Sequence, residues 1–296
     1  MKTLRYLLIS ITALSCTTSI ADENIFGYVK GAETLPAESW EVYQSITQRT
    51  DKGIGDYEAL NLSTEVEYGF TDRLTGGIAL NAQSIDTQGI IIDGYLPKDE
   101  SYSLRTSGVE AALKYNFLSP AKDDFGLAGY LEFSNSWLDP HSGQDKDTYS
   151  VDLALLMQKY FLEGQLIWAG NVAMETTYAK RDEIENLPVG FEWPTEPEME
   201  IELSVGTGLS YRVVSNWFIG AETIYETEFE TEVGQERWSW FAGPSIHYGS
   251  ADWWLTLTYF KQLEGGKEQY PDQADTDLHL IEKTKQEIRA KIGFNF

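Results

Sequence analysis

The chain has 296 residues, 13% of them aromatic, and its 47 acidic and 22 basic side chains give a formal net charge of −25. This charge argues against a nucleic-acid partner, because phosphate binding requires basic patches. The single cysteine excludes an internal disulfide framework.

The first 21 residues have the features of a secretory signal. Lys2 and Arg5 precede a short apolar run over residues 7–14, and small residues lead up to Ala21. The run is too short to span a bilayer as a helix, and no later stretch approaches the roughly 20 apolar residues required. We therefore expect cleavage after Ala21 and export of the mature chain.

Residues 201–211 show the pattern that recurs through the rest of the chain. Apolar residues and threonine stand at the odd positions from Ile201 to Tyr211, and charged or small residues stand between them. Successive side chains of a strand point to opposite faces, so one face is apolar for about ten residues, the length of a tilted membrane-spanning strand. A soluble β-sandwich, the alternative, usually has strands of about five or six residues.

The same alternation predicts twelve strands, which we place at residues 40–49, 59–70, 74–84, 106–117, 125–137, 149–161, 165–178, 200–213, 217–229, 237–248, 253–263 and 283–296. The predicted fold is all-β: a transmembrane, antiparallel, up-and-down barrel over residues 39–296. Residues 22–38 are expected to form a periplasmic N-terminal segment, either beneath the barrel or tucked inside it.

The predicted connections alternate between short and long. Those at 71–73, 162–164 and 214–216 are short, whereas those at 85–105 and 179–199 are long. Bacterial outer-membrane barrels have short periplasmic turns and longer external loops. The sequence therefore predicts a Gram-negative outer-membrane protein with both termini in the periplasm.

Aromatic residues stand beside the short turns, where a strand leaves the apolar layer. Such rings are favoured at a membrane interface because one end is apolar and the other is wet. The predicted aromatic girdle consists of Tyr68, Phe70, Tyr115, Phe117, Tyr160, Tyr211, Trp217, Tyr248, Trp253, Phe294 and Phe296.

The last predicted strand alternates without a break and ends on an aromatic residue, Phe296. This ending resembles the targeting strand of outer-membrane proteins that the barrel-assembly machinery recognises. We expect that machinery, outer-membrane lipid and lipopolysaccharide to be partners of the chain.

Three segments carry a family resemblance: Phe26-Gly-Tyr28, Thr34-Leu-Pro36 and residues 65–74 (EVEYGFTDRL). They resemble an uncharacterised proteobacterial family of outer-membrane β-barrels. That family is distantly similar to outer-membrane proteins associated with phenol degradation. The resemblance implies a barrel over most of the chain and transfers no catalytic residue.

By the same alternation, charged side chains face the lumen. The predicted inward residues are Glu65, Glu67, Glu110, Lys114, Glu132, Asp152, Glu202, Arg212, Glu222, Arg289 and Lys291. Arg289 and Lys291 are expected to lie beside the first strand, near Glu41. Unpaired charges in a dry interior are costly, so two interpretations stay open. Either the charges pair across the lumen and close it, or they line a water-filled channel with a preference for small cations.

The long connections are acidic, with clusters over residues 183–200, 226–236 and 264–277. A solvated, self-repelling surface explains them, and bridging by divalent cations to lipopolysaccharide is the alternative. The spacing of a calcium-binding loop does not occur. We predict no metal site and no cofactor.

Ser245, His247 and Glu222 are of the residue types needed for acyl transfer, which makes an outer-membrane lipid hydrolase a remote alternative. Ser245 and His247 share the inward face of one strand, whereas the lipid substrate of an outer-membrane hydrolase lies outside. We therefore predict that the chain is not an enzyme. The preferred functions are a small channel or facilitator, or a closed structural barrel.

Overall fold

The computed structural model describes residues 24–90, 99–183, 195–230 and 234–296. The predicted signal peptide at 1–21 and the acidic residues Glu185, Glu192 and Glu232 lie outside this part of the chain. No helix among the described residues is long and apolar enough to cross a membrane.

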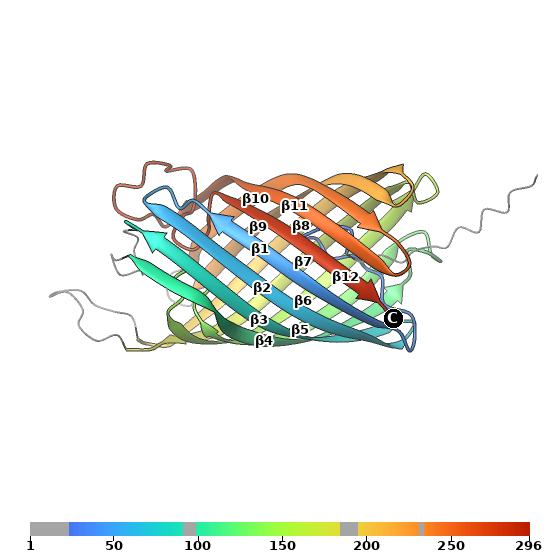
Figure 1. The fold of residues 1–296 in the computed structure, drawn as a ribbon, viewed down its shortest axis with the longest axis horizontal. Helices are drawn as coiled ribbons and strands as arrows, with labels where there is room; N and C mark the ends of the chain where they lie inside the picture. Colours follow the sequence, from blue (N-terminus) through green and yellow to red (C-terminus); the bar gives the residue numbers. More distant parts are fainter. Residues whose placement is uncertain (1–23, 91–98, 184–194, 231–233) are drawn as a thin grey trace, which may run out of the picture.

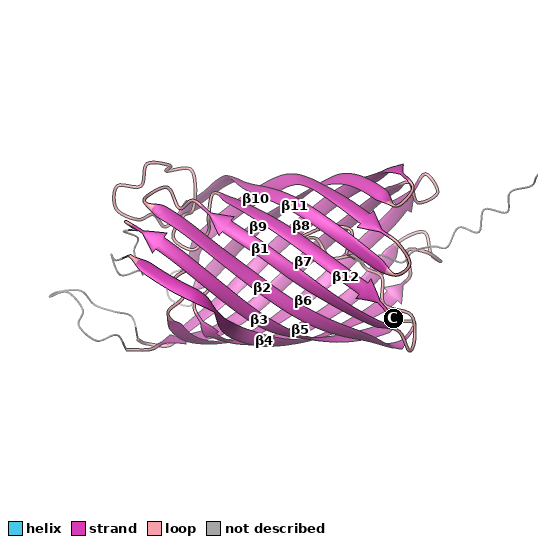
Figure 2. Cartoon of the chain, viewed as in Figure 1, coloured by secondary structure: helices cyan, strands magenta, loops and turns pink. Residues whose placement is uncertain are grey.

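Twelve antiparallel strands form a closed barrel in which each strand pairs with its neighbours in sequence (Figures 1 and 2). The strands are β1 (Trp40–Thr50), β2 (Asp56–Thr71), β3 (Leu74–Gln88), β4 (Glu100–Leu118), β5 (Gly126–Leu138), β6 (Asp145–Phe161), β7 (Leu166–Arg181), β8 (Glu198–Val214), β9 (Trp217–Glu230), β10 (Gly234–Gly249), β11 (Trp253–Lys267) and β12 (Gln286–Asn295). The all-β barrel and its strand number are as the alternation predicts.

The barrel closes where the last strand meets the first. β12 pairs with β1 from Glu41↔Asn295 to Thr50↔Gln286. Beyond this ladder, the N–H of Trp40 lies 3.1 Å from the carbonyl of Phe296, and the reciprocal distance is 2.9 Å. The terminal aromatic residue is therefore tied to the beginning of β1.

The two ends of the barrel differ. The end that carries the short connections and the C-terminus is called the turn end, and the opposite end is called the loop end (Figure 1). At the turn end, β8 and β9 are joined by only Ser215 and Asn216, and Asn216 has a φ of 70°. Asparagine tolerates this left-handed conformation better than most residues.

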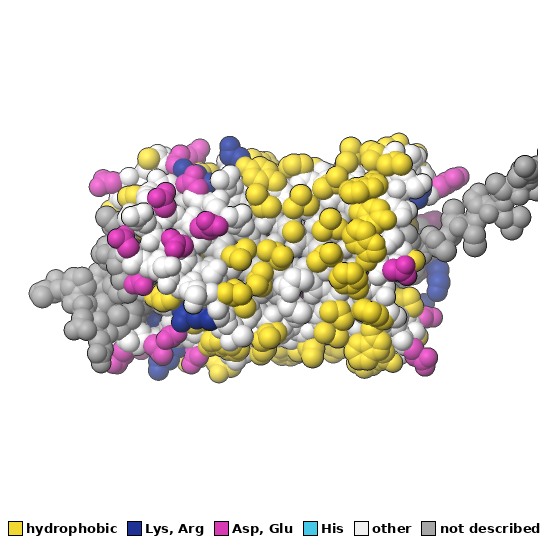
Figure 3. Space-filling model, in the orientation of Figure 1, with side chains coloured by type: hydrophobic (Ala, Val, Ile, Leu, Met, Phe, Trp, Pro, Cys, Tyr) yellow, Lys and Arg dark blue, Asp and Glu magenta, His cyan; other side chains and the backbone are white. Residues whose placement is uncertain are grey.

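Several strands extend farther toward the loop end than predicted. β4 begins at Glu100 rather than residue 106, and β6 begins at Asp145 rather than residue 149. On the face visible in Figure 3, apolar side chains form a broad band, and acidic side chains gather toward the loop end. The apolar alternation stops at the edge of that band, but the backbone pairing continues past it.

Candidate functional site: the occupied lumen

Residues 24–35 lie inside the barrel near the turn end, and we name them the plug. Ile25, Phe26, Val29 and Ala32 are each at most 1% exposed. The first three pack with Ile167 and Ala169 of β7, and Ala32 packs with Ala128, Tyr130 and Leu156. Of the two placements left open for the N-terminal segment, beneath the barrel or inside it, residues 24–35 have the one inside. The apolar side chains of the plug explain this placement, since burial removes them from water.

A single carboxylate anchors the middle of the plug. Glu222 of β9, which is 2% exposed, accepts hydrogen bonds from three consecutive backbone N–H groups. Its Oε1 lies 2.8 Å from the nitrogen of Gly27, and its Oε2 lies 2.8 Å from that of Tyr28 and 3.0 Å from that of Val29. Hydrogen bonds to an ionised acceptor are stronger than neutral ones, so Glu222 is a principal anchor.

Amide side chains of the wall bind the next part of the plug. Asn171 is bonded to the N–H of Lys30 at 2.7 Å and to its carbonyl at 2.8 Å. Gln158 accepts from the N–H of Ala32 at 2.7 Å, and Asn116 donates to the Ala32 carbonyl at 2.6 Å. The wall thus supplies the hydrogen bonds that buried backbone groups require.

The beginning of the plug joins β1, β11 and β12. Asn24 donates to Glu41 at 3.0 Å, and Glu41 also accepts from the indole of Trp254 at 3.0 Å. Lys291 donates to the side-chain oxygen of Asn24. Asn24 therefore connects Lys291 with Glu41, two residues that the sequence predicts to lie close together.

Small inward residues leave space for the plug. A β-carbon placed on Gly208 of β8 would lie 2.7 to 2.9 Å from the ring of Phe26. A β-carbon on Gly206 would be 3.4 Å from Val29. Glycine at position 208 is thus required for the close approach of the aromatic ring to the wall.

At the loop end, residues 139–144 turn into the barrel. Asp139 forms an ion pair with Arg181 at 2.9 Å, and Gln83 donates to its carbonyl at 2.9 Å. The Nδ1 atom of His141 lies 3.0 Å from a guanidinium nitrogen of Arg49, and Tyr57 donates to the His141 carbonyl at 2.9 Å. Burial and the neighbouring Arg49 hold the pKa of His141 well below its usual value.

The segment of residues 268–285 forms the second part of this closure. Lys52, which is fully buried, donates to the carbonyls of Leu280, Ile281 and Lys283 at 3.3, 2.6 and 3.2 Å. Burial and the nearby Arg49 lower the pKa of Lys52 to about 7.

Ion pairs fix this segment to the wall. Arg237 of β10 lies 2.9 Å from Glu282 and forms a two-pronged pair with Glu228, and Glu236 and Glu200 lie 3.1 and 3.7 Å away. Lys283 is 2.6 Å from Glu226 and 3.8 Å from Glu202. These ion pairs attach the inward segment to the barrel wall at the loop end.

A polar cavity of about 550 Å³ lies between the two closures. Residues 26–30 of the plug line it on one side, and Pro140 of the inward turn lines it on another. Its charged lining residues are Lys30, Arg49, Glu65, Glu110, Glu132, Glu175, Arg289 and Lys291. The lumen is therefore neither filled throughout nor open throughout.

The predicted inward residues have different positions. Glu65, Glu110, Glu132, Arg289 and Lys291 line the cavity. Glu67 lies beside Glu65, Lys114 is buried, Asp152 and Glu202 lie along the carboxylate row described below, and Glu222 binds the plug. Arg212 shares the parity of the inward residues of β8 but is exposed near the turn end and does not line the cavity, so its assignment to the lumen stays a prediction.

Aromatic side chains surround the turn end on the outer wall, as the ring contacts show. The rings of Tyr68 and Phe70 are 5.1 Å apart, those of Tyr115 and Phe117 are 5.2 Å apart, those of Trp217 and Tyr248 are 5.0 Å apart, and those of Tyr248 and Trp253 are 4.6 Å apart. Tyr211, Phe294 and Phe296 are exposed.

The prediction for Tyr160 is wrong. Its hydroxyl donates to Glu33 at 2.7 Å and accepts from Gln158 at 3.0 Å, so it points into the barrel. Even-numbered residues of β6 face inward here, and the adjacent Phe161 is 40% exposed. Since two aromatic residues stand next to each other, an error of one residue in the assigned face exchanges them.

The proposed hydrolytic set has other partners. Glu222 is bonded to the plug, and the Nδ1 atom of His247 lies 2.7 Å from Thr256. His247 and Ser245 are both buried, at 1% and 7% exposure. The arrangement thus positions the plug and gives no support to acyl transfer.

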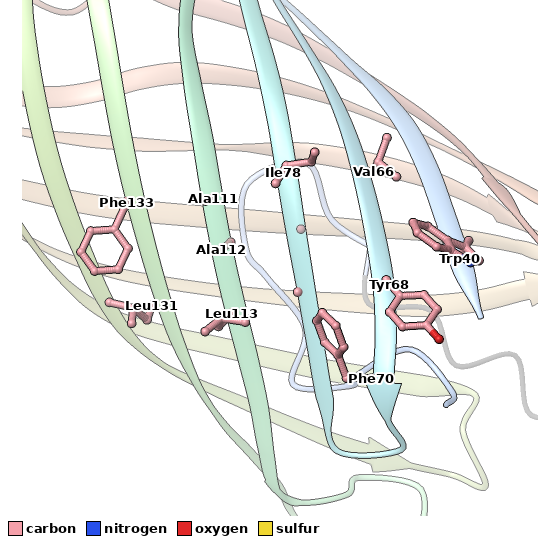
Figure 4. Close-up of a pocket in the computed structure, with 12 residues that line it drawn as sticks. Trp40, Val66, Tyr68, Phe70, Ile78, Ala111, Ala112, Leu113, Leu131 and Phe133 are labelled. Atoms are coloured by element: carbon pink, nitrogen blue, oxygen red, sulfur yellow. The ribbon is translucent and has the colours of Figure 1, made fainter. Parts of the chain in front are cut away.

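The outer wall carries an apolar groove of about 610 Å³ across β1 to β5 (Figure 4). The rings of Trp40, Tyr68 and Phe70 stand along one part of it, and Ile78 and Phe133 line other parts. It suits a hydrocarbon chain, as expected for the surface of a barrel in lipid.

Solved structures with the same fold are outer-membrane barrels. The COG4313 outer membrane channel from Pseudomonas putida F1 is 12% identical with a TM-score of 0.58, and the match covers 90% of this chain and 98% of that chain. The β domain of the Bordetella autotransporter BrkA is 13% identical with a TM-score of 0.54, covering 88% and 100%. The translocator domain of NalP from Neisseria meningitidis is 10% identical with a TM-score of 0.51, covering 87% of each chain.

At these identities the likeness shows the fold alone. None of the curated proteins compared with the chain matches it. The sequence model of a family of unknown function, DUF6662, matches residues 18–296.

Proposed function

The chain belongs to the DUF6662 family of unknown function, and we propose that it is a small outer-membrane channel with a preference for cations, closed by its own plug. The polar cavity between the plug and the inward turn carries this proposal. A barrel of twelve strands is wider than the roughly eight-stranded barrels whose side chains fill the interior. The space is thus large enough for a small solute once the two closures move.

The attachment of the plug favours a movable closure. Its hydrogen bonds to the wall are made with side chains such as Glu222, Asn171 and Gln158, and the first strand begins only at Trp40. Withdrawal of the plug therefore breaks side-chain contacts but leaves the barrel ladders intact. A barrel wall that stays closed while the plug leaves the lumen is consistent with the plug acting as a gate.

The charges of the wall favour cations. A row of five carboxylates, Glu132, Asp152, Glu175, Glu202 and Glu228, crosses β5 to β9 at directly paired positions. Their field in a low-dielectric barrel attracts positive solutes. By the asymmetry of its connections, we place the turn end in the periplasm and the loop end outside.

A closed structural barrel is the second candidate. The ion pairs of Arg237 and Lys283 favour it, because they fix the inward segment firmly at the loop end. Binding of lipopolysaccharide or divalent cations by the acidic connections belongs to this candidate and stays a prediction. The similarity to barrels associated with phenol degradation also stays a prediction. For a channel, it would add small hydrophobic molecules to the solutes that could pass.

Ion selectivity in a planar bilayer tests the proposal. With a KCl gradient across the membrane, the channel predicts current steps and a reversal potential of the sign given by K⁺. The double variant Asp152→Asn and Glu202→Gln should move the reversal potential toward zero, whereas Glu163→Gln, in an exposed turn, should not. The absence of current over many insertions, with or without removal of the plug, would favour the closed structural barrel.

A further inference from the structure

The central members of the carboxylate row form no ion pair among the described residues, although Lys30 acts on Asp152 from a longer distance. Lys30 lies 3.6 Å from Glu132, Lys283 lies 3.8 Å from Glu202, and Arg237 pairs with Glu228. Asp152 and Glu175, which stand between these pairs, form no ion pair among the described residues. Thr177 donates to Glu175 at 3.0 Å, and the buried Oδ1 atom of Asp152 has no hydrogen-bond partner there.

Such a pair is unfavourable without a cation. Asp152 and Glu175 are directly opposite each other on neighbouring strands, where like charges repel. Glu175 lines the cavity, and Asp152 is paired with it across the ladder without lining the cavity itself, so a positively charged group of a solute would contact Glu175. A cationic group at this point would complete the alternation of charges along the row.

Two cations lie across the lumen from this pair. In the closed ring of twelve strands, β12 and β6 are on opposite sides. Arg289 and Lys291 of β12 both line the cavity. Arg289 donates to Thr47 at 2.8 Å and to the carbonyl of Gly27 at 3.2 Å, and Lys291 donates to Asn24.

The hydrogen-bond and ring partners of these two cations are neutral, and the carboxylates of Glu65 and Glu41 act on Lys291 only from beyond ion-pair distance. The guanidinium of Arg289 also lies 3.8 Å from the ring centre of Tyr28, and the ammonium of Lys291 lies 4.8 Å from that of Tyr43. Within the described ranges, neither residue forms an ion pair with a carboxylate. The cavity therefore has carboxylates on one side and cations on the other that form no ion pair among the described residues.

We propose that the cavity binds small zwitterions that carry an ammonium group at one end and a carboxylate at the other. The ammonium group would lie at Glu175, beside Asp152, and the carboxylate at Arg289 and Lys291. The volume of about 550 Å³ is in the range of small-molecule sites. A ligand with a single charge would pair with the groups on only one side of the cavity. The site should therefore select zwitterions over ligands that carry one charge.

This inference rests on the proposed function, because the cavity is the space through which a solute would pass. Equilibrium binding tests it separately from passage. Isothermal titration of the full chain, folded in detergent, would compare ε-aminocaproate with hexylammonium and with caproate. We expect the zwitterion to bind about tenfold or more tightly than either single-charge analogue.

Variants locate the site. Asp152→Asn combined with Glu175→Gln should weaken zwitterion binding about tenfold or more, whereas Glu163→Gln should leave it unchanged. Heat-modifiable mobility on gels identifies any variant that does not fold, and the comparison of the three ligands on the parent chain still stands in that case. Equal affinity for hexylammonium and the zwitterion would overturn the proposal in favour of a cation site, and no binding of any of the three would overturn it altogether. Binding without current would leave the site in place and refute the channel.

Discussion

The N–H of Tyr28 lies 2.8 Å from Oε2 of Glu222, and the two neighbouring N–H groups, of Gly27 and Val29, bond the same carboxylate. One side chain of the barrel wall thus binds three consecutive residues of the plug. The plug contributes no strand to the barrel, so its position depends on such contacts.

Replacement of Glu222 by alanine should release the middle of the plug. The three N–H groups would lose their charged acceptor inside the barrel, and each such bond contributes about 1.5–3 kcal/mol. Hydrogen exchange should show faster exchange of the Gly27, Tyr28 and Val29 amides. Glu222→Gln retains one acceptor oxygen and should give an intermediate rate, and unchanged exchange in both variants would contradict this role.

Gly208→Val should displace the plug by a different route. The added β-carbon would lie 2.7 to 2.9 Å from the ring of Phe26, closer than van der Waals contact permits. We expect faster proteolysis within residues 24–35 while the barrel keeps its heat-modifiable mobility. Leu209→Val changes the adjacent outward residue and serves as the control; equal proteolysis in the two variants would contradict the packing described here.

Arg237→Ala should loosen the loop end. It would leave Glu228 and Glu282 without their shared cation, and the loss of one partner of a buried pair typically costs about 3–5 kcal/mol. Limited proteolysis should then cut within residues 268–285. Arg237→Lys keeps the charge and should protect the segment in part. If the alanine variant resists the protease as well as the parent does, these ion pairs do not hold the loop end closed.

Acidification should loosen the same end. Burial and the nearby Arg49 lower the pKa of His141. Burial and the nearby Arg237 lower the pKa of His279 to about 4. The released segments bind more protons than the docked ones below the ordinary histidine pKa of about 6.5. Docking is therefore fully stable above that pH and weakens as the pH falls from about 6.5 toward 4.

Proteolysis at pH 7.5 and at pH 5 measures this effect, with a protease active at both values. The parent should be cut faster within the inward segments at the lower pH. The double variant His141→Gln and His279→Gln should lose most of the difference. An equal pH dependence in parent and variant would assign the effect to other groups.

The barrel could be predicted from the sequence because each strand repeats one local rule. Alternation places side chains on two faces, and residues 201–211 show it without reference to any other part of the chain. The strand ends at Glu100 and Asp145 cannot be predicted by this rule, because hydrogen bonding continues where the apolar face stops.

The plug could not be placed in this way. Residues 24–35 have no period, and their position depends on wall residues nearly two hundred positions away in the chain, such as Glu222. A signal was present nonetheless: Asn116, Gln158 and Asn171 have inward positions, and buried amides need partners. Residue type cannot decide between Tyr160 and the adjacent Phe161, because both suit the girdle, and it is Tyr160 that points into the barrel.

Removal of the plug tests the central claim most directly. A chain lacking residues 24–35 should fold into the same barrel and show larger or more frequent current steps in a planar bilayer than the full chain. Such a result would identify the segment as the closure of a channel. A folded barrel without the plug that passes no more current than the full chain would contradict the account.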